Sequence, residues 1–169
     1  MSAAANEIYI YGNYAYIASS RDNQELQVAE ISDPANPSMA GSYNLSDIHD
    51  SLSIIGFNNT ILVGRSNGEV AIFDVSTLNS PILSGTYNGF SEAINDISLG
   101  NDNNYAFLAS NADNAEFQVI DISTPANPAS IGFLDISGDL NGVAYHGDKD
   151  RAFAVGENNS KELTVIAPQ

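Results

Sequence analysis

The residues best suited to chemistry are two histidines and a large set of carboxylates. His49 and His146 are the side chains whose ordinary pKa would let them act as general bases near neutral pH. Asp50 and Ser51 follow His49 directly, but a catalytic triad is assembled from separated segments rather than from neighbours in sequence. The chain has no cysteine, no zinc-ligand spacing and no phosphate-binding glycine loop. We therefore expect a protein that is not an enzyme.

Four glutamates recur at one place in the sequence. Each precedes a short apolar run, and successive members are 44, 47 and 46 residues apart. Such a set could form a repeated acidic ring that attracts cations or a basic partner. Alternatively, each carboxylate could cap a hairpin by accepting a backbone hydrogen bond. The set is Glu25, Glu69, Glu116 and Glu162.

A second group of polar residues lies in the loops that lead into the first run of each repeat. If these loops gathered at one end of a central channel, their side chains could bind a ligand or partner. Converging carboxylates could hold Ca²⁺ through oxygen ligands, although no loop has the Asp-x-Asp-x-Asn-Gly pattern of a dedicated calcium site. No other cofactor is expected. The candidates are Asp47, His49, Asp50, Glu92, Asp96, Asp139 and Asn141.

Composition limits the partners. The 21 acidic residues outnumber the 5 basic ones, giving a formal net charge of -16, which repels nucleic-acid backbones and anionic lipid headgroups. No apolar run approaches the 18 residues needed to span a membrane, so this segment is not expected to insert directly. A protein or a glycan is the expected partner.

The carboxylates are carried by a repeat of about 45 residues, in the range of propeller blades. Three segments align: ELQVAEISDPANPSMAG (25–41), EVAIFDVSTLNSPILSG (69–85) and EFQVIDISTPANPASIG (116–132), and a fourth, ELTVIAP (162–168), stops before the turn. Two further apolar runs, joined by a turn rich in Gly, Asn and Asp, precede each of them. One unit therefore predicts four antiparallel strands, with a proline turn before the last.

Both faces of the predicted strands carry apolar residues, so neighbouring sheets must cover them. Radial stacking of four-stranded sheets gives a β-propeller. We predict an all-β fold and one domain over residues 1–169, with repeats at about 6–50, 51–94, 95–140 and 141–169. The last repeat is incomplete, so about fifteen strands are expected.

The segments LQVAEISDPANPSMAGSY and FQVIDISTPANPASIGFL resemble the LVIVD repeat of bacterial and archaeal propellers, and GNYAYIA (12–18) matches its first half. The resemblance covers essentially the whole chain. It implies a propeller from a varied group of surface and secreted proteins, so an extracellular or cell-surface location is expected. Fold analogy alone does not assign a function.

Three arrangements of the incomplete repeat remain open. The chain could be a compact four-bladed propeller whose last blade has three strands or is completed by the N-terminus. It could be half of a larger ring closed by a second copy, or part of a longer chain. An incompletely covered blade invites self-association.

The resulting functional prediction is a non-enzymatic extracellular module for adhesion or for protein or glycan recognition on a microbial surface. The alternative is a structural subunit or decorating domain of a pilus-like filament or surface layer, which contacts its neighbours through blade edges.

Overall fold

The computed structural model describes residues 4–89, 91–157 and 162–167, and these form fifteen β-strands and one short 3-10 helix. The strand number matches the expectation from the repeat. In chain order the strands are β1 (Ala5–Tyr11), β2 (Tyr14–Ser19), β3 (Leu26–Glu30), β4 (Ser38–Tyr43), β5 (Ser51–Phe57), β6 (Thr60–Arg65), β7 (Glu69–Asp74), β8 (Ile82–Asn88), β9 (Ile94–Leu99), β10 (Tyr105–Ser110), β11 (Phe117–Asp121), β12 (Ala129–Leu134), β13 (Leu140–His146), β14 (Arg151–Gly156) and β15 (Leu163–Ile166).

The strands form four antiparallel sheets, each made of consecutive strands. We call β1–β4 blade 1, β5–β8 blade 2, β9–β12 blade 3 and β13–β15 blade 4. Within the described part of the chain, blades 1 to 3 have four strands each and blade 4 has three. Each blade occupies one predicted repeat, except that the first strands of blades 1, 3 and 4 begin one residue earlier than the predicted repeats, at Ala5, Ile94 and Leu140. The fold class is therefore all-β, as the sequence predicts.

The turns explain why the chain reverses where it does. Gly12 and Asn58 have positive φ in the first hairpins of blades 1 and 2, a conformation that Gly and Asn adopt most readily. The proline turns share one backbone hydrogen bond, which the Asn36 N–H donates to the Asp33 carbonyl and the Asn127 N–H donates to that of Thr124. Blade 2 forms the same turn with fewer prolines.

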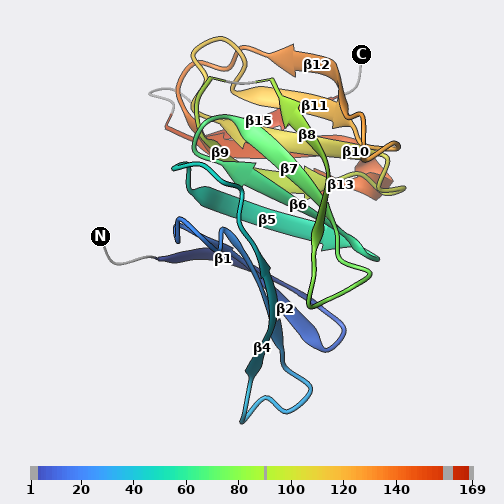
Figure 1. Cartoon of the computed structure of the whole chain (residues 1–169). Helices are drawn as coiled ribbons and strands as arrows, with labels where there is room; N and C mark the ends of the chain where they lie inside the picture. Colours follow the sequence, from blue (N-terminus) through green and yellow to red (C-terminus); the bar gives the residue numbers. More distant parts are fainter. Residues whose placement is uncertain (1–3, 90, 158–161, 168–169) are drawn as a thin grey trace.

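The blades stack face to face around their first strands. β1 packs against β5, β5 against β9 and β9 against β13 (Figure 1), so these four strands are the inner strands of an arc. We call the face that a blade turns toward the next blade in sequence its front, and the opposite face its back. A buried apolar cluster fills each of the three blade–blade interfaces. The core is thus three layers of side chains between sheets.

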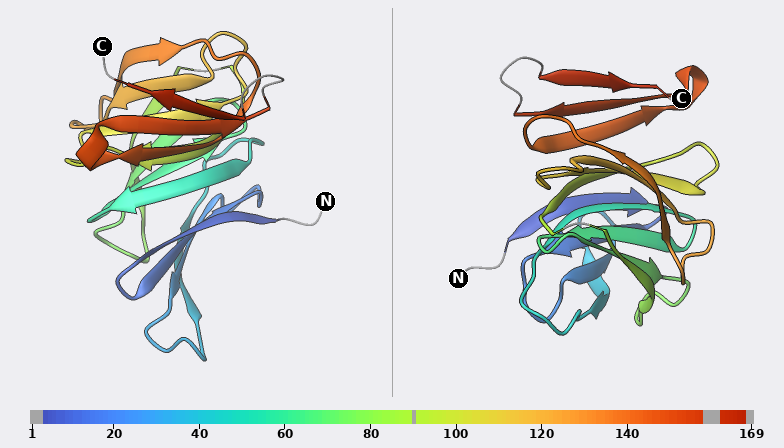
Figure 2. Two further views of the ribbon diagram at one scale, coloured as in Figure 1. Left: turned by 180° about the vertical axis from the view of Figure 1, so that it is seen from behind. Right: turned by 90° about the horizontal axis from the view of Figure 1, so that it is seen from above.

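The arc is not closed into a ring. Among the described residues no contact comparable to those between successive inner strands joins β13 to β1, and blades 1 and 4 lie at opposite ends of the stack (Figures 1 and 2). The N-terminal strand β1 pairs with β2 and does not complete blade 4. Of the alternatives drawn from the sequence, the compact four-bladed ring is therefore not what this chain forms alone. No helix in the described ranges is long and apolar enough to cross a membrane.

Candidate functional site

Two of the four repeated glutamates tie loops to the sheets. Glu25 and Glu116 are almost fully buried. The Oε2 atom of Glu25 accepts a hydrogen bond from the Leu45 N–H at 2.9 Å, and that of Glu116 accepts one from the Ile136 N–H at 2.6 Å. Each bond fixes the loop that leaves the outer strand of the same blade. For these two residues the geometry is that of a backbone cap, not of an open acidic ring.

The third glutamate belongs to an ion cluster around Arg65, a fully buried side chain in β6. The Arg65 guanidinium donates to Glu69 Oε1 at 2.7 Å, to both carboxylate oxygens of Asp47, and to the His49 carbonyl at 3.0 Å. The hydrogen bond from Arg65 holds the pKa of Asp47 below its ordinary value. The carboxylates of Asp47 and Glu69 therefore balance the positive charge of the buried Arg65 guanidinium, and the His49 carbonyl accepts one more of its hydrogen bonds. The fourth glutamate, Glu162, is exposed.

The remaining loop candidates do not gather at one point. Glu92 and Asp139 are exposed, while Asp50 is half-buried and its N–H donates to Ser66 Oγ at 3.0 Å. Across residues 4–89, 91–157 and 162–167, no three His, Asp or Glu side chains come together at a metal-binding spacing. The predicted convergence of carboxylates is therefore not seen in the described part of the chain.

Asp96 has a different position from the one expected, because it lies within the inner strand β9 and joins two blades. Its Oδ2 accepts a hydrogen bond from the Val143 N–H of blade 4 at 2.7 Å. Glu7 does the same at the joint between blades 1 and 2, accepting the Ile54 N–H at 2.6 Å. Burial raises the pKa of both carboxyls, against the lowering effect of these hydrogen bonds.

An asparagine precedes each of these acids and bonds to the same neighbouring blade. The Asn6 Nδ2 donates to the Ser51 carbonyl, and the Asn95 Nδ2 donates to the Leu140 carbonyl, both at 2.7 Å. Both asparagines are the extra residue of a β-bulge in an inner strand. Asn141, another sequence candidate, is the extra residue of the corresponding bulge in β13. The repeated Asn–acid pair was the sequence signal for these joints.

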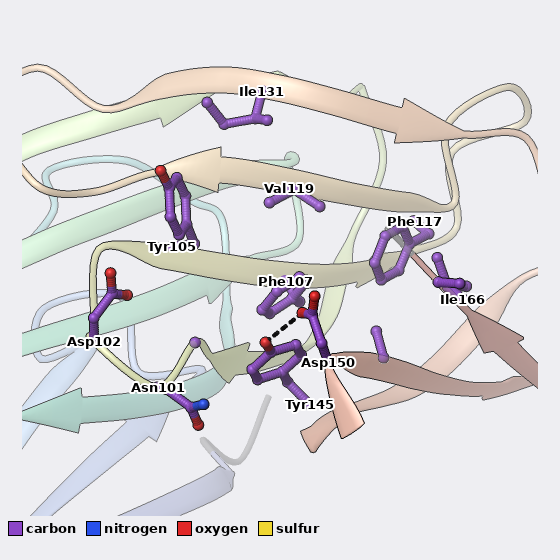
Figure 3. A pocket seen from close by; sticks show the side chains of 13 residues that line it. Asn101, Asp102, Tyr105, Phe107, Phe117, Val119, Ile131, Tyr145, Asp150 and Ile166 are labelled. Atoms are coloured by element: carbon purple, nitrogen blue, oxygen red, sulfur yellow. Dashed lines mark hydrogen bonds between the residues drawn. The ribbon is translucent and has the colours of Figure 1, made fainter. Parts of the chain in front are cut away.

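A groove of about 540 Å³ lies between blades 3 and 4 (Figure 3). Tyr145 stacks on Phe107 with ring centroids 4.6 Å apart, and its hydroxyl donates to Asp150 at 2.7 Å, which raises the pKa of Tyr145. The groove thus has an aromatic floor and an acidic rim. The lining residues used below are Asp102, Tyr105, Phe107, Val119, Ile131 and Tyr145.

The groove is open because blade 4 has no fourth strand among the described residues. In the other two interfaces the outer strand of one blade lies against the proline turn of the next. An added Cβ on Gly41 would overlap the backbone of Leu78, and one on Gly85 would overlap that of Pro125. A Cβ on the equivalent Gly132 of blade 3 would meet nothing within 4 Å. Nearby, Ile131 is 59% exposed.

Comparison with solved structures supports the propeller fold. The chain is similar to the β-propeller domain of Cps50 (Swd1) from Myceliophteria thermophila, with TM-score 0.70, 17% identity and coverage of 90% of this chain and 52% of that one. It is also similar to the computationally designed Ika4 protein, with TM-score 0.73, 14% identity and coverage of 98% and 92%. A chain of the Mitotic Checkpoint Complex matches with TM-score 0.68 and 17% identity, over 98% of this chain and 51% of that one.

This chain therefore spans about half the length of two of these structures. No curated protein sequence matches it significantly. The sequence profile of the LVIVD repeat matches residues 3–45, 59–89 and 95–136, which together exceed half of the chain. With blades of the length and order expected of that repeat, the chain belongs to the LVIVD repeat family.

Proposed function

We propose that this chain is a non-enzymatic, extracellular recognition module that binds an extended segment of a partner protein in the groove between blades 3 and 4. The observation that carries the proposal is the edge of β15, which has no neighbouring strand on that side among the described residues, whereas blades 1 to 3 each have a fourth strand there. A strand edge without a neighbour offers backbone donors and acceptors to an added strand.

The shape of the groove favours a polypeptide. Gly41 and Gly85 are covered by the turn of the following blade, while Gly132 faces open space that a strand and its turn would fill. Val119 and Ile131 line the same space and would supply apolar contacts for alternate side chains of the added strand. The groove thus combines a backbone edge with side-chain pockets, as strand-addition sites do.

The acidic rim of the groove favours binding over catalysis. Asp150 accepts a hydrogen bond from the Tyr145 hydroxyl, and Asp102 accepts two from Asn104, one from its backbone N–H and one from its side-chain amide. These carboxylates hold turns in place. Tyrosine beside such polar groups is typical of protein-recognition surfaces. A matched solved chain comes from a multiprotein assembly, the Mitotic Checkpoint Complex, which agrees with a recognition role for propellers of this shape.

The probe for this proposal is a synthetic peptide with the sequence of residues 123–134, the turn and outer strand of blade 3. We expect saturable binding by fluorescence anisotropy. The variant Gly132→Leu should reduce binding at least about tenfold, because its side chain would occupy the groove. The control Ser38→Leu adds the same side chain to an exposed site on the outer strand of blade 1 and should bind normally.

Equal binding by Gly132→Leu, or no saturation with the parent protein, would contradict the proposal. An oligosaccharide that binds and is lost on Tyr105→Ala would assign the groove to glycans instead. The location is tested separately, by labelling intact cells of the source organism with a membrane-impermeant reagent and asking whether the protein is labelled.

A second candidate is a structural role in a surface assembly. It is favoured by exposed apolar side chains on both ends of the arc, at Ile8 and Ile10 on the back of blade 1 and at Leu163 and Val165 on the front of blade 4.

A further inference from the structure

We infer that the front of blade 4 binds the back of blade 1 in a second copy of this chain, and that two copies close a ring head to tail. The inference deepens the structural role proposed above and is independent of the groove between blades 3 and 4. It starts from the three interfaces already present in the molecule, which all use the same strand positions.

The strand registers identify the unused front. Tyr16 pairs with Val28 in blade 1, and Phe153 pairs with Val165 at the same positions in blade 4. In blades 1 and 2 this front is buried against the next blade: Leu26 and Val28 of blade 1, and Val70 and Ile72 of blade 2, are 0% exposed. Their counterparts in blade 4, Leu163 and Val165, are 54% and 55% exposed. Blade 4 therefore presents an interface of the established kind without a partner.

The unused back lies at the other end of the arc. Ile8 pairs with Ile17 in blade 1, as Ile54 pairs with Val63 in blade 2. Ile54 is 5% exposed because blade 1 covers it, whereas Ile8 is 56% exposed. The back of blade 1 therefore has the apolar residues that blade 2 uses to receive its neighbour.

A polar contact sets the register of the added interface. At two existing joints the bulge asparagine donates to a backbone carbonyl at the start of the next inner strand, Asn6 to Ser51 and Asn95 to Leu140. Asn141 is the bulge residue of β13, is exposed, and makes no side-chain hydrogen bond within the described residues. The carbonyl equivalent to those of Ser51 and Leu140 is that of Ala5. In the pair of chains, Asn141 would donate to Ala5 of the other copy.

A second copy suits these surfaces better than an unrelated protein, because one chain has both halves of the same interface. Such an interface is heterologous and gives either a closed ring or an open filament. This chain spans 52% of the solved chain of the Cps50 (Swd1) β-propeller domain. Two copies therefore supply the length of that propeller, which favours closure.

The test is analytical ultracentrifugation over a roughly hundredfold dilution series. We expect one species with twice the mass of a single chain. Val165→Glu and Ile8→Glu should each raise the dissociation constant more than about a hundredfold, because each places an unpaired charge in the apolar contact. Both sites are exposed in the single chain, so the fold should be retained. Ile82→Glu alters a similarly exposed isoleucine on the outer strand of blade 2 and should pair normally.

Mixing the two defective variants tests the head-to-tail geometry. The Val165→Glu chain keeps an intact back, and the Ile8→Glu chain keeps an intact front. The mixture should therefore form a one-to-one pair, although neither variant pairs alone. Asn141→Ala should weaken pairing of the parent chain about fivefold, the effect of one lost hydrogen bond. Asn127→Ala, on an exposed turn, should have no effect.

Three results would overturn the inference: a single chain at all concentrations, pairing by Ile8→Glu alone, or polymers in place of a closed pair. The groove is tested separately. Gly132→Leu should leave pairing unchanged, and Ile8→Glu, in blade 1, should leave binding of the 123–134 peptide unchanged.

Discussion

At the scale of single residues, the blade joints depend on carboxylates that are partly removed from water. Asp96 accepts the Val143 N–H, and Glu7 accepts the Ile54 N–H. Neither carboxylate forms an ion pair within the described residues. Burial without a counter-charge disfavours the charged form, which is why the pKa of each is raised. The buried negative charge thus destabilises the contact between the blades, while the hydrogen bond that the carboxylate oxygen accepts from the backbone stabilises it.

Because the charge of the carboxylate is unfavourable and its hydrogen bond is favourable, the stability of the fold should depend on pH. The pKa of Asp96 is higher in the folded than in the unfolded chain. Protonation therefore stabilises the fold fully below the unfolded pKa, and this contribution is lost as the pH rises through the folded pKa. Asp96→Asn should keep an oxygen that accepts the hydrogen bond from the Val143 N–H. Its free energy of unfolding should lose the pH dependence that the Asp96 carboxyl causes between pH 7 and about pH 4. Asp96→Ala should cost about 1–3 kcal/mol at pH 7, because the Val143 N–H is left unpaired.

Urea unfolding at several pH values measures both effects. The change Asp113→Asn, at an exposed loop carboxyl, is the matched control and should keep the pH profile of the parent. If Asp96→Asn also kept that profile, the buried carboxyl would not be the titrating group. If Asp96→Ala were as stable as Asp96→Asn, the hydrogen bond to Val143 would contribute nothing.

At the scale of elements, the glycines of the outer strands set how closely the blades approach. Gly85 lies directly against the turn at Pro125 in the next blade, where a side chain would overlap backbone atoms. Backbone atoms at a blade–blade contact cannot move without moving the turn itself. Gly132 has the same place in its repeat but no turn opposite it. The same residue type therefore has a packing role at one position and leaves an open groove at the other.

A pair of alanine substitutions separates these roles. Gly85→Ala should lower the free energy of unfolding by roughly 1–3 kcal/mol, because the added methyl group overpacks the interface. Gly132→Ala should be neutral or slightly stabilising, since the methyl group meets open space and restricts the unfolded chain. Thermal unfolding of both variants checks this. Equal losses of stability would mean that the effect comes from the strand and not from the neighbouring blade.

Short-range patterns predicted the elements well. The Gly- and Asn-containing turns, the proline turns and the alternation of apolar residues fix strands by local chemistry, so the fifteen strands could be counted from the sequence. For Glu25 and Glu116 the sequence left two alternatives, an acidic ring or backbone caps, because it does not show which carboxylates are buried beside a backbone donor. Asn95 and Asp96 could not be assigned to a joint, since their partners, Leu140 and Val143, lie one repeat further along the chain.

At the scale of the whole molecule, the repeat predicts the blade but not the closure of the ring. Every blade has the same two apolar faces, so the sequence alone is compatible with a compact ring, with half of a larger ring closed by a second copy, or with part of a longer chain. What distinguishes them is the rotation from one blade to the next, and this rotation depends on packing around the inner strands. In the structure, four blades leave the front of blade 4 and the back of blade 1 exposed.

Charge gives the last prediction, for the proposed pair of chains. Each copy carries a formal net charge of -16, so two copies repel one another while their apolar faces attract. Raising the salt concentration from about 0.1 M to about 1 M shortens the screening length from about 10 Å to about 3 Å. Pairing should therefore become at least about threefold tighter in sodium chloride, measured by sedimentation. Sodium thiocyanate screens charge equally without strengthening apolar contacts, and tightening in both salts would assign the effect to charge. Weaker pairing at high salt would mean that opposite charges hold the copies together, and the apolar faces would then not be the interface.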